Sequence, residues 1–256
     1  MMNYKICDPS GNITILVTDE VSKEKRIEVA DELLKLEPTG QQVGFVSKGD
    51  GTCDLVIDMA GEEFCGNAML SGAALYKQSH RDTDIVRIKM SGAKDVIDVT
   101  VLLDGEQYIA TAQMPMPDMD EPRVMTFLGK EYKTFLVRFD SMVHLVMLDR
   151  LNEDDIKPAI RQWNDELKCG ALGIMDYDED TSVLIPAVLS NNGSFFCFES
   201  SCASGTTAVA IYLAEKYKSE IEREIKEPGG TLKINAKPGG YVVLTNTVRI
   251  CEYWIF

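Results

Sequence analysis

Histidine, tryptophan and positive charge are scarce in this sequence of 256 residues. It has two histidines and two tryptophans, and 26 Lys and Arg stand against 41 Asp and Glu, which gives a formal net charge of −15. The longest basic cluster is the short segment KEKR at 23–26. Because nucleic acids and anionic membranes attract positively charged surfaces, we expect neither of them as a partner.

Long apolar runs and closely spaced cysteine pairs are also missing. No uncharged apolar stretch reaches the roughly 18 residues of a membrane-spanning helix. The N-terminal segment has no apolar core of secretory length, so we expect a cytoplasmic protein. The seven cysteines are an odd number and include no CxxC pair. This pattern favours free thiols over a disulfide framework, and it argues against a zinc site or any other metal site.

Two stretches share one pattern, in which a cysteine is followed by small residues and then by an uncharged apolar run. Cys65 is followed by GNAMLSGAALY, and Cys202 is followed by ASGTTAVAIYLA. Apolar residues on every side predict a helix that is buried all round rather than an amphipathic surface helix. We therefore expect each cysteine to begin a buried helix, and the second helix to turn polar at Glu215 and to end before Pro228.

Strand-like segments fill most of the remaining sequence, which predicts an α+β fold with strands around each buried helix. The segment 114–122 (MPMPDMDEP) is rich in proline and acidic residues, and we expect it to be irregular. We place a domain boundary there, between an N-terminal half at 1–114 and a C-terminal half at 115–247. The last strand, near 248–256, is expected to return to the first half.

The position of the two cysteines indicates acid and base chemistry. Unpaired backbone N–H groups at a helix start favour anions and lower the pKa of a thiol. Two such thiols on opposite sides of a carbon acid could remove a proton from one face and return one to the other, which inverts the configuration. The same N–H groups could hold the α-carboxylate of an amino acid. The simpler alternative is a pair of buried cysteines that only pack.

The cysteine segments resemble a known enzyme family. FCGNA at 64–68 and SCASGT at 201–206 are similar to the two active-site signatures of the diaminopimelate epimerase-like fold, whose racemases and epimerases work without pyridoxal phosphate. Within that fold the likeness is strongest to the histidine racemases of bacterial opine-metallophore biosynthesis. It rests on four more segments, PSGNITILV at 9–17, QVGF at 42–45, VH at 143–144 and PGG at 228–230.

The resemblance implies two pseudo-symmetric domains, each a mostly antiparallel strand barrel wrapped round its central helix. It also implies a homodimer that needs no cofactor and acts on a small amino acid. Cys65 and Cys202 would be the catalytic acid and base, and His144 and Glu199 would tune which thiol is ionised. The positions that would bind the substrate are Asn12, Gln42, Gly66, Asn67, Ala203 and Ser204.

Departures from the family pattern bear on the substrate. No arginine occurs between Gly170 and Ser204, where diaminopimelate epimerases carry one for the distal carboxylate of their substrate. Phe195, Phe196 and Phe198 predict apolar walls that suit an imidazole. The resemblance to histidine racemases, with which these departures are compatible, implies the conversion of L-histidine to D-histidine. Ala203 replaces a more frequent glycine, and it would be strained if the backbone there needed a positive φ.

Three alternatives stay open at this point. One is epimerisation of diaminopimelate or another amino acid on the same fold. A second is a thiol-redox protein that uses Cys65 with Cys202, or Cys197 with Cys202, although no thioredoxin-type motif is present. A third is a module that binds an amino acid without catalysis.

Overall fold

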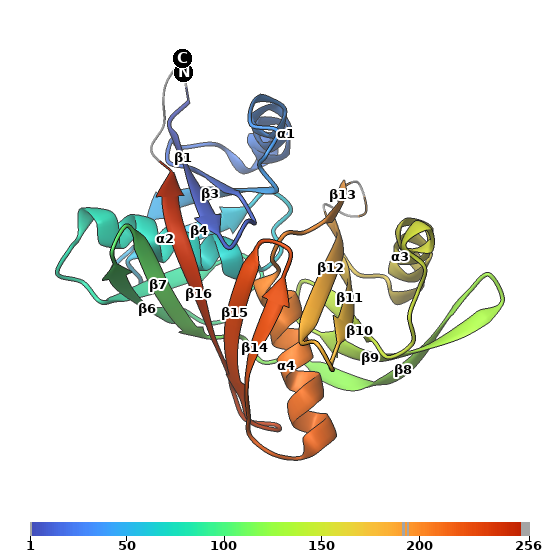
Figure 1. The fold of residues 1–256 in the computed structure, drawn as a ribbon. Coiled ribbons are helices and arrows are strands. Elements are labelled where there is room, and N and C mark those ends of the chain that lie inside the picture. The colour runs from blue at the N-terminus through green and yellow to red at the C-terminus, as the bar shows by residue number, and fades with distance from the viewer. Residues whose placement is uncertain (1, 191–192, 194, 252–256) are drawn as a thin grey trace. The chain divides into compact units, whose positions relative to one another are not determined.

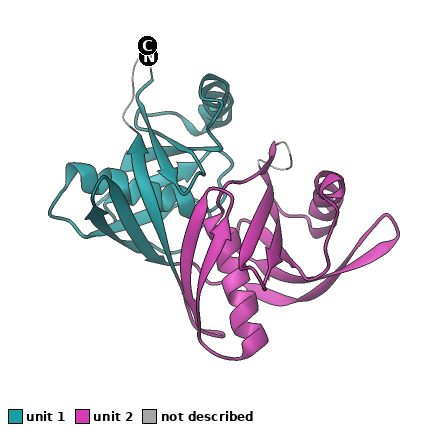
Figure 2. Ribbon diagram, viewed as in Figure 1, with its two compact units in different colours: residues 1–113, 244–256 teal, residues 114–243 magenta. Residues whose placement is uncertain are grey.

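The computed structural model describes residues 2–190, 193 and 195–251, and the chain divides into two compact units (Figure 2). Unit 1 comprises residues 1–113 and 244–256, and unit 2 comprises residues 114–243. Strands predominate and the described residues form four α-helices, which confirms the predicted α+β class. The assignment of 1–114 and 115–247 to two domains stays a prediction. Part of the predicted last strand, 252–256, lies outside the described residues.

Apart from its part of β16, the described residues of unit 1 form seven strands, two α-helices and one short 3₁₀-helix (Figure 1). In chain order these elements are β1 (Tyr4–Pro9), β2 (Thr14–Val17), η1 (Lys23–Lys25), α1 (Arg26–Leu36), β3 (Gln42–Lys48), β4 (Leu55–Met59), α2 (Gly66–Ser79), β5 (Ile85–Met90), β6 (Ile97–Asp104) and β7 (Gln107–Gln113). The last strand of the chain, β16 (Val242–Cys251), begins in unit 2 and continues in unit 1.

Unit 2 contains the remaining strands and the helices α3 and α4 (Figure 1). In chain order these elements are β8 (Met119–Phe127), β9 (Lys130–Arg138), β10 (Val143–Met147), α3 (Glu153–Leu167), β11 (Leu172–Asp178), β12 (Val183–Ser190), β13 (Phe195–Phe198), α4 (Ala203–Tyr217), β14 (Ile221–Glu227) and β15 (Gly230–Ala236).

The two units repeat one pairing plan. In unit 1 the neighbours run β1-β2-β3-β4-β5-β6, with directions antiparallel, parallel, antiparallel, parallel and antiparallel. In unit 2 the neighbours β9-β10-β11-β12-β14-β15 have the same five directions in the same order. The helices α1 and α3 lie in the first parallel crossover of their units, and α2 and α4 lie in the second. The chain therefore carries the same supersecondary plan twice.

The helices α2 and α4 are buried on every side, as the sequence predicts. Every residue of α2 from Gly66 to Ala74 is buried, and α4 is buried from Ala203 to Ile211. Helix α2 packs against all seven strands β1 to β7 of unit 1, and α4 packs against β9, β10, β11, β14 and β15 of unit 2. Strands around the whole circumference explain why neither helix has a polar face.

The helices α1 and α3 are ordinary amphipathic helices that each cover one side of a sheet. Helix α1 buries Ala30 and Leu33 against a cluster that includes Phe45 of β3. Helix α3 buries Trp163, whose indole N–H donates to the backbone oxygen of Thr126 at 2.9 Å. These two apolar clusters fix the outer helices while α2 and α4 occupy the interior.

Three local predictions were wrong. The segment 114–122 is not irregular throughout, because β8 begins at Met119 and pairs Pro122 with Phe135 of β9. Helix α4 ends at Tyr217, and the polar segment after it is the strand β14. Ile221 and Ile225 lie four residues apart, a spacing that suits a helix face as well as one face of a strand. The last strand, predicted near 248–256, begins earlier in the sequence, since β16 is continuous from Val242 to Cys251.

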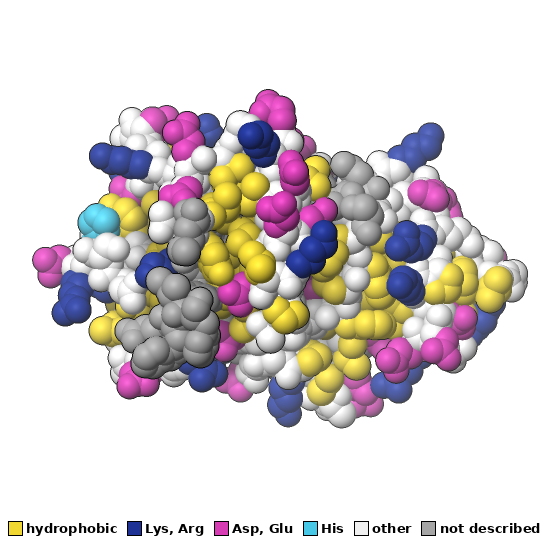
Figure 3. Space-filling model, turned by 90° about the horizontal axis from the view of Figure 1, so that it is seen from above, with side chains coloured by type: hydrophobic (Ala, Val, Ile, Leu, Met, Phe, Trp, Pro, Cys, Tyr) yellow, Lys and Arg dark blue, Asp and Glu magenta, His cyan; other side chains and the backbone are white. Residues whose placement is uncertain are grey.

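The surface carries charges of both signs. On the face drawn in Figure 3, Lys and Arg side chains are interspersed with Asp and Glu. None of the helices among the described residues is long and apolar enough to pass through a lipid bilayer.

Gly72 provides a test of how closely α2 approaches its strands. A Cβ atom added at Gly72 would lie 2.3 Å from Cδ1 of Ile57, which is fully buried in β4. Because a packed core resists added volume, Gly72→Ala should lower the free energy of unfolding by about 1–3 kcal/mol. Urea unfolding followed by circular dichroism measures this change. Ser79→Ala, at the exposed end of the same helix, is the control, and an unchanged midpoint for Gly72→Ala would contradict the close approach.

Candidate active site

Cys65 begins α2 in unit 1, as the sequence predicts. It is the N-cap residue, with an extended backbone at φ −131° and ψ 104°. Its Sγ accepts a hydrogen bond from the backbone N–H of Ala68 at 3.4 Å. Every helix start leaves backbone N–H groups without a partner inside the helix, and the thiol accepts a hydrogen bond from one of them.

Cys202 begins α4 in unit 2 with nearly the same geometry. Its backbone has φ −135° and ψ 97°, and its Sγ accepts from the N–H of Gly205 at 3.4 Å. A Cβ atom added at Gly205 would lie 3.1 Å from Sγ of Cys202 and 2.2 Å from Sδ of Met175. The glycine thus leaves room for the sulfur to reach the helix start. Each unit holds one thiol at the start of its buried helix.

Gln42 and Asn12 lie beside Cys65, as members of one hydrogen-bonded network. Gln42 Nε2 donates to Asn12 Oδ1 and to Thr14 Oγ1, each at 2.7 Å. These bonds form because Thr14 and Gln42 are paired positions of the parallel strands β2 and β3. The bonds direct Oε1 of Gln42 toward Sγ of Cys65 at 2.8 Å. Because an amide oxygen only accepts, the Cys65 thiol is the donor in this arrangement.

His144 and Ser204 form the corresponding polar chain beside Cys202. Nε2 of His144 lies 3.0 Å from Oγ of Ser204, which in turn lies 3.6 Å from Sγ of Cys202. His144 in β10 pairs with Gly173 in β11, where an added Cβ would lie 2.2 Å from Nδ1 of the imidazole. The absence of a side chain at Gly173 therefore makes room for the histidine inside unit 2.

Burial sets the charge state of this chain of groups. His144 is fully buried, which lowers its pKa from 6.5 to about 3, so the imidazole is neutral. Burial is also the largest cause that raises the pKa of the Cys202 thiol, and the carboxylates of Glu199 and Glu227 raise it further. The expectation that a helix start lowers the pKa is therefore wrong for Cys202. Desolvation and two nearby acidic side chains outweigh the helix terminus there.

Glu227 is the site residue that sequence reasoning missed. It is the last residue of β14, and its Oε2 accepts from the backbone N–H of Cys202 at 2.6 Å. Its Oε1 accepts a short hydrogen bond from the hydroxyl of Thr206 in α4. One signal was available, because Glu227 has the strand parity of the buried residues Ile221 and Ile225.

The remaining predicted positions fall in the first turns of the two helices. Gly66 and Asn67 open α2, Ala203 and Ser204 open α4, and all four are buried. Ala203 is the first helical residue, with no positive φ, so the predicted strain does not arise. Backbone N–H groups at a helix start favour an anion such as a carboxylate. The two helix starts could therefore each hold negative charge.

The predicted aromatic walls are only partly consistent with the structure. The rings of Phe196 and Phe198 contact each other with centroids 5.4 Å apart. Phe196 also packs against the apolar cluster that contains Trp163 and α3, and Phe198 is 41% exposed. Phe196 therefore has a packing role in unit 2.

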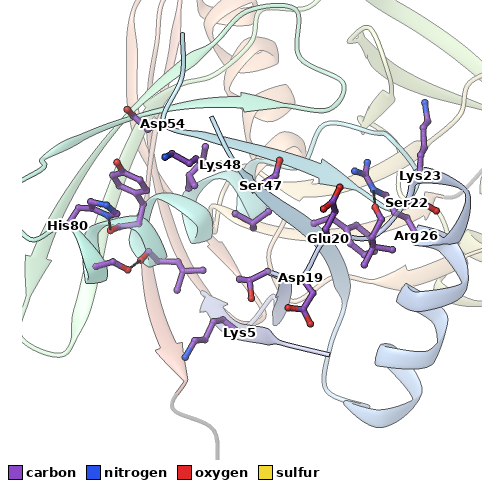
Figure 4. A pocket seen from close by; sticks show the side chains of 18 residues that line it. Lys5, Asp19, Glu20, Ser22, Lys23, Arg26, Ser47, Lys48, Asp54 and His80 are labelled. Atoms are coloured by element: carbon purple, nitrogen blue, oxygen red, sulfur yellow. Dashed lines mark hydrogen bonds between the residues drawn. The ribbon is translucent and has the colours of Figure 1, made fainter. Parts of the chain in front are cut away.

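A separate groove of about 950 Å³ lies in unit 1, at the end of α2 remote from Cys65 (Figure 4). Tyr76 and His80 stack there with ring centroids 3.9 Å apart. Arg26 of the groove pairs with Asp58 at 2.9 Å. None of the predicted site residues lines this groove. The described residues also contain no group of three or more His, Cys, Asp or Glu side chains arranged to hold a metal, and all seven cysteines are free thiols.

Sequence comparison finds close relatives along nearly the whole chain. The family model described as "Histidine racemase CntK N-terminal domain" matches residues 1–249. A histidine racemase of Fusobacterium nucleatum is 32% identical over 244 residues, which cover 91% of this chain and 89% of the relative. A histidine racemase of Staphylococcus aureus is 26% identical over 248 residues, which cover 93% of this chain and 89% of the relative.

Structural comparison identifies the same type of fold in more distant proteins. A predicted epimerase from Pseudomonas aeruginosa matches with a TM-score of 0.71, and a phenazine biosynthesis protein of the PhzF family from Enterococcus faecalis matches with 0.62. Each is 14% identical and covers 98% of both chains. At this identity the likeness concerns the fold alone.

The charge state of His144 can be tested directly. We expect its imidazole resonance to stay constant from about pH 8 to about pH 5, because burial lowers the pKa to about 3. Nuclear magnetic resonance measures this, and His144→Gln identifies the signal by removing it. The folded state should also lose stability, relative to the variant, as the pH falls below 6.5, where the unfolded chain binds the proton more readily. A resonance that shifts with a midpoint near 6.5 would contradict the neutral assignment.

Proposed function

The chain belongs to the histidine racemase family, and from this premise we propose that it inverts the α-carbon of free histidine, converting L-histidine into D-histidine. The enzyme is an isomerase of the racemase type. The choice of histidine rests on sequence similarity to proteins named histidine racemase. This similarity extends over about nine tenths of this chain and of each relative. This kinship favours a racemase over the thiol-redox and binding-module hypotheses.

We propose a two-base mechanism in which Cys65 and Cys202 are the catalytic residues. One cysteine, as the thiolate, removes the α-proton, and the carbanion then accepts a proton from the thiol of the other cysteine on its opposite face. The removed proton stays on the first sulfur, so the two thiols exchange protonation states in each turnover. The reverse reaction uses the same groups in the opposite order. The matching N-cap geometries support this proposal.

We assign the substrate carboxylate to the first turns of α2 and α4. The backbone N–H groups of Gly66, Asn67, Ala203 and Ser204 belong to those turns, and such groups stabilise the negative charge that spreads into the carboxylate when Cα is deprotonated. Asn12 and Gln42 would contact the amino acid in unit 1. Their network supports this role, because it fixes the Gln42 amide beside the Cys65 thiol.

His144 and Glu199 are proposed to tune the Cys202 thiol. Neutral His144 reaches it through Ser204, and the negative charge of Glu199 raises its pKa. Diaminopimelate is the less favoured substrate, since the segment before Cys202 lacks an arginine for a second carboxylate.

The chemistry of thiols and backbone amides would operate without pyridoxal phosphate. We further propose that 1–114 and 115–247 are pseudo-symmetric domains, each a strand barrel round its central helix. The repeated pairing plan supports this view. A cytoplasmic homodimer completes the proposal, and sedimentation of the purified protein would measure its oligomeric state.

The reaction class and the substrate can be tested together in D₂O. Incubation with each L-amino acid in turn should place deuterium at Cα of histidine and should yield D-histidine, because the returning proton comes from a thiol that exchanges with solvent. Nuclear magnetic resonance reads the deuterium and chiral chromatography reads the enantiomer. Exchange on another amino acid but not on histidine would reject the substrate. No exchange on any of them would reject the racemase.

The two-base mechanism requires both thiols. Cys65→Ser and Cys202→Ser should each lower the rate of net racemisation by at least about 10²-fold, because a hydroxyl is a much weaker acid and base than a thiol. Cys251→Ser in unit 1 and Cys169→Ser in unit 2 are matched controls at free thiols outside the proposed site. Activity that survives in either of the first two variants would argue against the mechanism.

A further inference from the structure

Glu227 is a buried carboxyl group without a cationic partner among the described residues. It is 7% exposed, and it accepts hydrogen bonds from the backbone N–H of Cys202 and the hydroxyl of Thr206. Burial raises its pKa to about 8, although both hydrogen bonds act in the opposite direction. A carboxyl group kept in such a place at the start of a catalytic helix calls for an explanation beyond packing.

The titratable neighbours of Glu227 all belong to the Cys202 site. Glu199, in the loop before α4, acts on Glu227 by charge repulsion. Cys202 itself lies one backbone hydrogen bond away. His144 of β10 reaches Cys202 through Ser204 and is neutral. Among these described neighbours, no positive charge therefore offsets the negative charge that an ionised Glu227 would add to Glu199.

The contact with Cys202 couples the two acids. A thiolate at Cys202 and a carboxylate at Glu227 would place two like charges in a buried environment, where their repulsion is screened only weakly. A protonated Glu227 avoids this repulsion and keeps both hydrogen bonds. It can donate its proton to Oγ1 of Thr206 while its other oxygen still accepts from the N–H of Cys202. The carboxyl group can thus change its charge without moving.

We propose that Glu227 is a positioning residue that decides when Cys202 can carry negative charge, so that the thiolate forms only while Glu227 holds a proton. The inference rests on the proposed function, in which Cys202 alternates between thiol and thiolate. When Cys202 gives its proton to the substrate carbon, the negative charge stays on sulfur and Glu227 remains neutral. When the pH rises and Glu227 loses its proton to solvent, this step becomes less favourable.

Glu227→Gln tests the coupling, because the amide keeps one acceptor for Cys202 and one donor for Thr206 but can never ionise. The measurement is the ultraviolet absorbance of the thiolate as a function of pH. Subtracting the same titration of a Cys202→Ser protein, in each background, isolates the signal of Cys202. We expect Cys202 to ionise at a lower pH in Glu227→Gln, by about one pH unit or more.

Two further variants keep the test decisive. Thr206→Val removes a hydrogen bond that favours the ionised form of Glu227, so it should shift the Cys202 titration in the same direction by a smaller amount. Asp120→Asn is the control, because it neutralises another carboxyl group of unit 2 whose pKa is raised by burial and by Glu215, near the far end of α4. It should leave the Cys202 titration unchanged. An unchanged Cys202 titration in Glu227→Gln and Thr206→Val, or an equal shift in Asp120→Asn, would overturn the proposal.

A pH profile of racemisation adds a second readout. In the parent enzyme kcat/KM should fall as the pH rises through about 8, as Glu227 ionises, and this fall should be absent or displaced upward in Glu227→Gln. The thiolate titration does not depend on turnover. A shifted titration in a protein that racemises nothing would uphold the coupling and reject the function. Racemisation with an unshifted Cys202 titration would uphold the proposed function and reject the coupling.

Discussion

The hydrogen bond from a helix start to a cysteine sulfur is the constraint on which the rest of this structure depends. To place a thiol there, each helix must begin in the interior, and its whole circumference must then be apolar because strands surround it. The uncharged runs after Cys65 and Cys202, the small residues of the first turns and the repeated pairing of the strands all follow from this placement. The fold and the chemistry thus share one local geometry.

The two units differ in what they place beside that geometry. Unit 1 places the neutral amide of Gln42 beside its thiol, and hydrogen bonds to Asn12 and Thr14 across the parallel strands fix that amide. Unit 2 uses its first parallel pair to hold a buried imidazole against Gly173, and it places two carboxyl groups near the sulfur. Enantiomers have equal free energies, yet the two proton transfers that connect them need not meet equal barriers. An internally repeated fold can therefore hold two thiols whose surroundings, and hence whose acidities, differ.

Sequence patterns predicted the features that depend on neighbours along the chain. The apolar runs identified both buried helices, and the position of each cysteine before small residues identified the helix starts. Glu227 lies 25 residues after Cys202, in a segment rich in charged residues, and it reaches the helix start because β14 packs against α4. Pro122 likewise argued against a strand, since its tolerance in β8 depends on tertiary pairing. Long-range contacts of this kind are not encoded in local periodicity.

The strand β16 has a consequence for the order in which the protein can fold as it leaves the ribosome. Strands β1 and β7 of unit 1 both pair with β16, most of which follows unit 2 in the sequence. Domains generally fold as units during synthesis, with the N-terminal one first. Here the strands of the N-terminal unit cannot all pair until the residues of unit 2 have been synthesised. Cys65, although it is made first, therefore gains its finished surroundings only after unit 2 has been made.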